Sequence, residues 1–235
     1  MTEPRSGAGV DPGPPLAGLI VDWGGVLTGA LQDCLSAFCE ADGIDYGQFR
    51  DVMREWLGAA GEASAAGNPA HHLERGELPG PEFERALAAR LTTRDGSPVQ
   101  AEGLLQRMFA QFRNDEAGGG GMAGVVHRAH RAGIRTAVCS NSWANTYPRE
   151  GWPELFDAVV ISGEVGMRKP EPAIFRHTAR LLSLPPQRCV FVDDLTANVR
   201  GAVAVGMVGV CHRTVGETVG ELEALFGIPL GAAAA

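Results

Sequence analysis

Five side chains suited to phosphate chemistry are spread along the 235-residue sequence: Asp22, Ser140, Lys169, Asp193 and Asp194. A carboxylate can attack phosphorus only when its own charge and that of the phosphate are both offset, which calls for a metal ion and for cationic or hydrogen-bonding groups. The adjacent aspartates offer the hard oxygen ligands that suit Mg²⁺, and the lysine offers a fixed positive charge. The set indicates attack on a phosphate ester, with Asp22 as nucleophile and Mg²⁺ as cofactor.

Neighbouring residues could complete this site. Gly24 and Gly25 follow the proposed nucleophile, and a glycine turn lets backbone N–H groups approach a phosphoryl group. Gly24 could also offer its carbonyl to a metal ion, and Asn141 its N–H to substrate. The predicted catalytic residues are Asp22, Ser140 and Lys169, the substrate-binding residues are Gly25, Asn141 and Lys169, and the metal ligands are Asp22, Gly24, Asp193 and Asp194.

Short apolar runs precede three of these residues and predict buried strands. They cover residues 16–21, 134–139 and 189–192, and a further strand is expected over 208–211. Helical periodicity, for example over 172–182, separates the runs. This alternation predicts an α/β fold, a Rossmann-like parallel sheet with right-handed crossovers. Because ligands bind at the carboxyl ends of such strands, the residues that follow the runs should meet in one crevice.

Residues 31–113 differ from the rest because their pattern is helical. Apolar residues recur at three- and four-residue spacing in three segments, 31–41, 46–60 and 80–91. We therefore expect an inserted α-helical domain over 31–113 and an α/β core built from 16–30 and 114–230. Residues 1–15 are rich in Pro and Gly, and we expect them to form a disordered tail.

Overall composition narrows the class of protein. A net charge of -8 argues against binding to nucleic-acid backbones, which needs clustered Lys and Arg. No apolar run is long and uninterrupted enough to span a bilayer, and the five cysteines lack disulfide-framework spacing. We therefore expect a cytoplasmic protein, monomer or homodimer, with neither a nucleic-acid nor a membrane partner.

Four segments stand in an informative order along the chain: 19–28 around Asp22, 136–141 with Ser140, 168–170 with Lys169, and 190–194 with the paired aspartates. One such segment would be a weak signal, but four in this order are specific. Together they resemble the motifs of the haloacid dehalogenase-like superfamily of phosphatases, and they frame most of the chain from Leu16 to Cys211.

This resemblance implies roles for the candidate residues. It implies that Asp22 forms an aspartyl-phosphate, that Ser140 and Lys169 bind the phosphoryl group, and that Asp193, with Asp194, coordinates Mg²⁺. It also implies that the helical insert is a cap that selects the substrate. The expected activity is removal of phosphate from a small metabolite such as a sugar phosphate.

Gly24 departs from the pattern of the family. Most of its phosphatases carry an aspartate there, two residues after the nucleophile, as general acid and base. Loss of such a group typically slows a reaction by about 10²- to 10⁴-fold. Family members with a similar Asp-x-Gly-x-Val motif include sugar-phosphate phosphatases, so activity is still expected.

Two other functions stay open. A 2-haloacid dehalogenase uses aspartate to attack carbon without metal, and its relatives also lack the second aspartate and carry a Ser-Asn pair like Ser140-Asn141. The adjacent Asp193 and Asp194 argue against it, because a metal-free site gains little from a second carboxylate. A non-catalytic binding protein of the same superfamily is the other alternative, with Gly24 marking decay of the chemistry.

Several residues beside the motifs have an ordinary structural interpretation. His71 and His72 are adjacent, and adjacent residues point different ways on a helix, so we expect surface histidines and no zinc site. Asn198 could satisfy a helix start or belong to the site. Trp23 and Trp143 flank the site and could line it.

Overall fold

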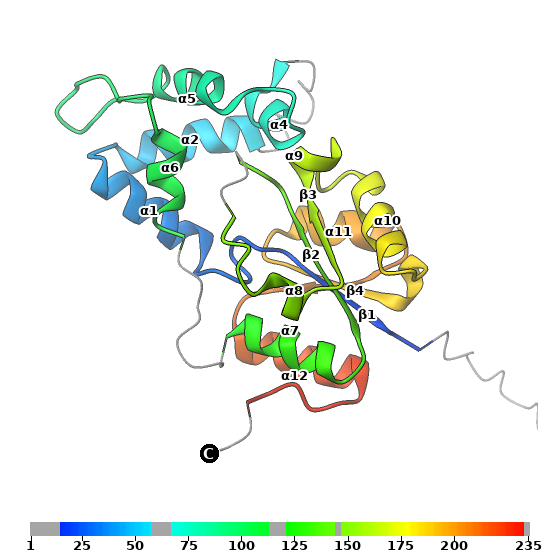
Figure 1. Cartoon of the computed structure of the whole chain (residues 1–235). Coiled ribbons are helices and arrows are strands. Elements are labelled where there is room, and N and C mark those ends of the chain that lie inside the picture. Colours follow the sequence, from blue (N-terminus) through cyan, green and yellow to red (C-terminus); the bar gives the residue numbers. More distant parts are fainter. Residues whose placement is uncertain (1–14, 58–66, 113–120, 144–146, 233–235) are drawn as a thin grey trace, which may run out of the picture.

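A five-stranded parallel sheet forms the centre of the computed structural model, which describes residues 15–57, 67–112, 121–143 and 147–232 (Figure 1). Its strands are β1 (Gly18–Val21), β2 (Arg135–Ser140), β3 (Ala158–Ile161), β4 (Cys189–Asp193) and β5 (Val208–Cys211). The spatial order β3-β2-β1-β4-β5 puts β1 in the middle. The predicted α/β fold is confirmed, while the predicted disorder of the tail lies, except for Pro15, outside the described residues.

Helices cover both faces of the sheet, which explains why β1 is apolar throughout. Leu19 and Val21 enter a core with α7 (Met122–Arg131) and α12 (Val215–Phe226). Ile20 points the other way, into a core with two further helices, α10 (Pro172–Leu181) and α11 (Thr196–Ala204). Shorter elements complete this part of the chain: α8 (Trp152–Leu155), α9 (Ser162–Val165) and the 3₁₀ turn η2 (Pro186–Arg188).

A separate group of helices is inserted between β1 and α7. It contains α1 (Leu31–Ala41), α2 (Tyr46–Leu57), α4 (Pro69–Glu74), α5 (Gly80–Ala88) and α6 (Leu104–Phe109). These helices share an apolar core of their own, which includes Phe38, Phe49 and Phe83. In Figure 1 the group lies beside the carboxyl ends of the strands. The described part of α2 ends at Leu57, so the expected continuation to residue 60 lies outside the described residues; α5 ends three residues earlier than expected.

The insert is tied to the α/β core through α4 and the residue after it. Glu74 forms a buried ion pair with Arg168, and Arg75 forms a second pair with Glu171. The hydroxyl of Ser162, in α9, donates to the backbone carbonyl of Glu74. These contacts link the insert to the segment that carries Lys169.

Insert and core also touch through backbone alone, at Gly76 and Gly163. A Cβ atom on Gly76 would lie 2.6 Å from the carbonyl oxygen of Gly163, and the φ angle of Gly76 is +73°. Glycine is the residue that satisfies both conditions, because it lacks Cβ and adopts positive φ readily.

His71 corrects one expectation from the sequence. His72 is partly exposed, with its Nδ1 atom 2.5 Å from Glu77, as expected for a surface residue. His71, by contrast, is 2% exposed. Burial and the nearby Arg168 and Arg75 lower the pKa of the His71 imidazole to about 4, so it is neutral at neutral pH. The surface interpretation was therefore wrong for His71, because α4 turns this residue inward.

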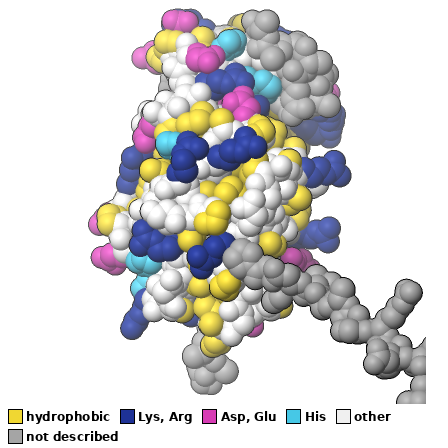
Figure 2. All heavy atoms as spheres, turned by 90° about the vertical axis from the view of Figure 1, so that its right-hand side faces the viewer, with side chains coloured by type: hydrophobic (Ala, Val, Ile, Leu, Met, Phe, Trp, Pro, Cys, Tyr) yellow, Lys and Arg dark blue, Asp and Glu magenta, His cyan; other side chains and the backbone are white. Residues whose placement is uncertain are grey.

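Figure 2 shows one face of the molecule, on which Lys and Arg side chains occur at several separate places with apolar and uncharged groups between them. A sequence-independent grip on a phosphate backbone needs a clustered basic surface. This face does not present one continuous basic stripe. Within the described residues, no helix is both long enough and apolar enough to cross a membrane.

Candidate active site

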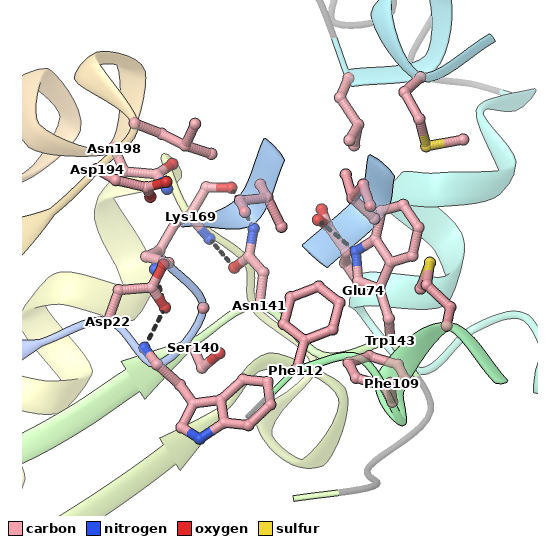
Figure 3. A pocket seen from close by; sticks show the side chains of 18 of the residues that line it. Asp22, Glu74, Phe109, Phe112, Ser140, Asn141, Trp143, Lys169, Asp194 and Asn198 are labelled. Carbon is pink, nitrogen blue, oxygen red and sulfur yellow. Dashed lines mark hydrogen bonds and ion pairs between the residues drawn. The ribbon is translucent and has the colours of Figure 1, made fainter. Parts of the chain in front are cut away.

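The carboxyl ends of the three central strands bring together residues that are far apart in the sequence. Asp22 directly follows β1, whereas Ser140 and Asp193 are the last residues of β2 and β4. The backbone N–H of Asp22 donates to the carbonyl of Val192 at 2.9 Å, which fixes where the chain leaves β1. A pocket opens at this point, and Asp22, Ser140 and Lys169 all line it (Figure 3).

Lys169 joins two of the aspartates. Its Nζ atom lies 2.8 Å from Oδ1 of Asp22 and 2.6 Å from Oδ2 of Asp193, and its side chain is 1% exposed. Burial by itself would lower the pKa of Lys169, but the two carboxylates outweigh this effect and raise it above its usual value. The lysine therefore keeps its positive charge in the buried site.

The site has three clustered carboxylates and one ammonium group, so negative charge exceeds positive charge. Ligand atoms of Asp22, Asp193 and Asp194 lie within 4.8 Å of one another. Burial raises the pKa of Asp22; Lys169 opposes the rise, and the other two aspartates add to it. Burial and Asp193 likewise raise the pKa of Asp194, to about 6. Both rises reflect negative charge without enough positive charge nearby.

Asp194 provides a direct test of whether a divalent cation fits here. Its Oδ1 atom is buried and has no hydrogen-bond partner among the described residues. A buried carboxylate oxygen without a partner is costly unless a cation or donor reaches it. Three clustered carboxylates with one such oxygen match the all-oxygen ligand sets that hold Mg²⁺. The donor set therefore fits the ion that the sequence predicts.

The two glycines after Asp22 differ in their surroundings. The N–H of Gly25 donates to Oγ1 of Thr28 at 3.0 Å, so the structure uses it within the turn, although we expected it to bind substrate. A Cβ atom on Gly25 would lie 2.4 Å from Oδ2 of Asp194, so this glycine instead makes room for that carboxylate. Gly24 lines the pocket, and a Cβ atom there would meet nothing within 4 Å.

Two asparagines hold the charged residues in place. The side chain of Asn141 accepts from the backbone N–H of Lys169 at 2.8 Å and donates to its carbonyl at 3.1 Å. Asn198 Nδ2 donates to both carboxylate oxygens of Asp193, each at 3.1 Å. Asn198, at the start of α11, thus orients the aspartate that ends β4, and Asn141 orients the lysine.

The remaining wall of the pocket contains residues that the motifs did not indicate. They include Glu74, Phe109, Phe112 and Tyr147. The Tyr147 hydroxyl lies 3.0 Å from Ser140 Oγ and donates to the carbonyl of Asn141, also at 3.0 Å. Trp23 and Trp143, which flank the motifs in the sequence, do line the pocket. The position of Trp23 and Trp143 beside the motifs was the sequence signal for this wall.

Comparison with known proteins identifies one family model that covers most of the chain. A family model described as haloacid dehalogenase-like hydrolase matches residues 16–206. The chain is 34% identical over 112 residues to mouse "Acyl-CoA dehydrogenase family member 10" and 29% identical over 137 residues to a phosphoserine phosphatase of Thermus thermophilus. These matches cover 46% and 54% of this chain but only 10% and 53% of the two relatives.

Solved structures show the same fold at low sequence identity. A family enzyme from Bacteroides thetaiotaomicron, in complex with magnesium and inorganic phosphate, matches with a TM-score of 0.57 at 18% identity, covering 84% of this chain and 94% of that one. A dehalogenase with an intermediate complex matches with a TM-score of 0.61 at 15% identity, covering 84% and 85%. The family model spans more than half of the sequence, and three of the four motifs lie at the strand ends described above, while the motif with Lys169 lies between α9 and α10. The chain belongs to the haloacid dehalogenase-like hydrolases.

Proposed function

We propose that the protein is a Mg²⁺-dependent phosphohydrolase that acts on a small phosphorylated metabolite through an aspartyl-phosphate on Asp22. One observation carries the proposal: three carboxylates cluster at the carboxyl ends of β1 and β4, a single buried lysine pairs with two of them, and one oxygen of the third has no partner among the described residues. A cation offsets this excess charge and allows a phosphate dianion to approach. Relatives that are named as phosphatases support the same reaction class.

The proposed reaction has two steps. An Asp22 oxygen attacks phosphorus and the bond from phosphorus to the leaving-group oxygen breaks, so the leaving group departs and takes a proton from water. Water then attacks the phosphorus of the aspartyl-phosphate, which releases inorganic phosphate and a proton and restores the carboxylate. Lys169 and the Ser140 hydroxyl contribute positive charge and a hydrogen bond to the phosphoryl oxygens.

The remaining site residues would hold the metal ion and the charged groups in position. Asp22, Asp193, Asp194 and the Gly24 carbonyl would hold Mg²⁺, which supplies electrostatic stabilisation of the transferring phosphoryl group. Asn198 and Asn141 keep Asp193 and Lys169 in place through the hydrogen bonds described above. Gly25 contributes space for Asp194.

The helical insert, in this proposal, is a cap over the site. Leu35, Met53 and Phe109 from the insert line the same pocket as Asp22 and Lys169. A substrate bound at Asp22 would therefore contact both parts of the chain. We propose residues 31–113 as the cap and residues 16–30 with 114–230 as the core, and cap contacts would then set substrate preference.

A 2-haloacid dehalogenase is the second candidate, because Gly24 lacks a carboxylate and much of the pocket wall is apolar. Such an enzyme would use Asp22 to displace halide from carbon. The carboxylate cluster favours the phosphatase, since the partly buried Asp194 adds negative charge that attack on carbon does not use.

The test is release of phosphate from a panel of aryl, sugar, nucleotide and small-acid phosphates, with Mg²⁺ or with a chelator. We expect activity that needs Mg²⁺ and that falls by at least about 10³-fold in Asp22→Asn. The matched control is Asp51→Asn, at an exposed position of α2, which should keep full activity. Release of halide from 2-haloacids without metal, and no release of phosphate, would replace the proposal with the dehalogenase.

A further inference from the structure

The half of the pocket that faces away from Asp22 is built largely from apolar side chains. Six of them are Leu35, Met53, Met108, Phe109 and Phe112 from the insert, and Trp143 from the core. Figure 3 shows Asp22, Lys169 and Asp194 on one side, whereas the labelled aromatic rings lie on the other side, together with Glu74. A bound phosphate ester would have its phosphoryl group at the charged side and its leaving group among the apolar side chains.

The polar groups on this side are already engaged by the protein. Glu74 Oε1 accepts from the indole Nε1 of Trp143 at 3.1 Å, and its Oε2 accepts from Arg168. The Tyr147 hydroxyl donates to Asn141. Among the described lining residues, the hydroxyl groups of a sugar would therefore replace good hydrogen bonds to water with few or none. A site of this kind disfavours polyols and favours apolar groups.

The volume of the cavity and the chemistry of the site narrow the choice of substrate further. The cavity has a volume of about 250 Å³, and an apolar cavity of about 150 Å³ is enough for benzene, so a ring and a phosphoryl group fit together. Gly24 also provides no acid to protonate the leaving group. Phenols have a pKa of about 10 and leave more readily as anions than alkoxides, so an aryl ester depends less on such an acid.

We propose that the preferred substrates are aryl phosphate monoesters, whose aromatic leaving group binds between the insert and the core against Leu35, Phe109 and Phe112. This proposal rests on the phosphatase function proposed above and narrows its substrate class. It replaces the sugar phosphate expected from the sequence with a substrate of low polarity. The aromatic ring gains contact with aromatic and aliphatic side chains and leaves no hydroxyl group unpaired.

Binding can be tested apart from catalysis with phosphonates, whose carbon–phosphorus bond the reaction does not cleave. We would titrate the Mg²⁺-loaded protein by calorimetry with benzylphosphonate, methylphosphonate and 2,3-dihydroxypropylphosphonate. Benzylphosphonate should bind about 10- to 100-fold more tightly than methylphosphonate. The dihydroxypropyl compound should gain nothing over methylphosphonate, because its hydroxyl groups lack partners.

Variants of the pocket wall test where the preference for the benzyl compound arises. Leu35→Asn, in α1, should weaken benzylphosphonate binding about 5- to 10-fold and leave methylphosphonate within twofold. Leu31→Asn, one turn earlier in the same wall, is a second variant in case the first lowers stability. The matched control is Leu181→Asn, because Leu181 is 46% exposed and lies outside the pocket.

The outcomes separate the two proposals. Equal affinities for the benzyl and methyl compounds, or tighter binding of the dihydroxypropyl compound, overturn the aryl proposal and leave the phosphatase function to its own assay. Tighter binding of benzylphosphonate that is lost in Leu35→Asn supports the aryl proposal. If no phosphate ester is hydrolysed while this preference holds, the phosphatase function fails and the aromatic pocket stands as a binding site.

Discussion

Gly24 is the residue at which this chain departs most clearly from the phosphatases it resembles. No side chain stands there to protonate a departing alkoxide, yet a Cβ atom would meet nothing within 4 Å and the backbone lies outside the left-handed region. The position therefore has room for the Cβ atom of a larger residue. In the proposed reaction, the missing acid at this position limits the hydrolysis of esters with poor leaving groups.

Gly24→Asp should consequently raise kcat/KM for alkyl phosphates by about 10- to 100-fold, because an acid now protonates the leaving oxygen. Hydrolysis of 4-nitrophenyl phosphate should change by less than about threefold, since its leaving group needs no proton. Steady-state kinetics on both substrates measure this difference. Gly24→Asn is the matched control, with similar size and no acid, and an equal gain in both variants would contradict the argument.

The site residues that lie at strand ends could be predicted from the sequence. Asp22, Ser140 and Asp193 follow apolar runs, and parallel strands bring such positions to one edge. Glu74 and Phe112 could not be predicted in this way, because their approach to the pocket depends on how the insert folds and docks. The N–H of Gly25 was assigned to substrate because hydrogen bonding within a turn leaves little trace in sequence.

At the scale of elements, the six-residue helix α4 links the insert to the core and to the pocket wall. Glu74, its last residue, pairs with Arg168, and the side chains are only 5% and 9% exposed. Glu74 also accepts from Trp143, so one carboxylate links the insert, the pocket wall and the segment before Lys169. A buried pair of this kind is costly to break on one side only.

Glu74→Gln should lower the free energy of unfolding by about 3 kcal/mol, because it leaves the Arg168 guanidinium buried without its charge partner. Urea denaturation measures the change. The control Glu82→Gln, at an exposed position in α5, should shift stability by less than about 0.5 kcal/mol. In the double variant with Arg168→Met, the loss should be smaller than in Glu74→Gln alone; purely additive losses would show that the pair is not coupled.

Elements with strong periodicity were predictable, and short ones were not. The predicted bounds of α1 agree with the structure, and those of α10 differ by one residue. The segments of α4 and α6 are six residues each, too short for a periodic pattern to stand out. Their helical form depends on packing against neighbouring helices, which a local reading of the sequence does not contain.

For the molecule as a whole, the buried His71 makes the free energy of unfolding depend on pH. Its pKa is about 4 in the folded protein, compared with 6.5 for a free imidazole, and the groups that act on it include Arg168, Arg75, Glu171 and His72. The unfolded chain therefore binds a proton at a higher pH than the folded one. The stability that depends on neutral His71 is complete above pH 6.5 and is lost as pH falls toward 4.

His71→Leu should remove this dependence. Between pH 7 and pH 4, the free energy of unfolding of the original protein should fall by about 2 kcal/mol more than that of the variant. Thermal or urea unfolding between pH 7 and pH 4 measures how steeply the free energy of unfolding changes with pH in each protein. His127→Leu, at an exposed position of α7, is the control and should follow the original protein. The same change in the free energy of unfolding with pH in all three proteins would mean that His71 does not titrate as the structure implies.

The contact between Gly76 and Gly163 has an evolutionary consequence. Because backbone meets backbone there, this contact between insert and core does not depend on the side chains that line the pocket. Substitutions at pocket positions such as Leu35 or Phe109 can therefore accumulate without moving this anchoring point. Variants that keep Gly76 can thus change the proposed substrate-contacting surface of the insert and still retain this contact with the core.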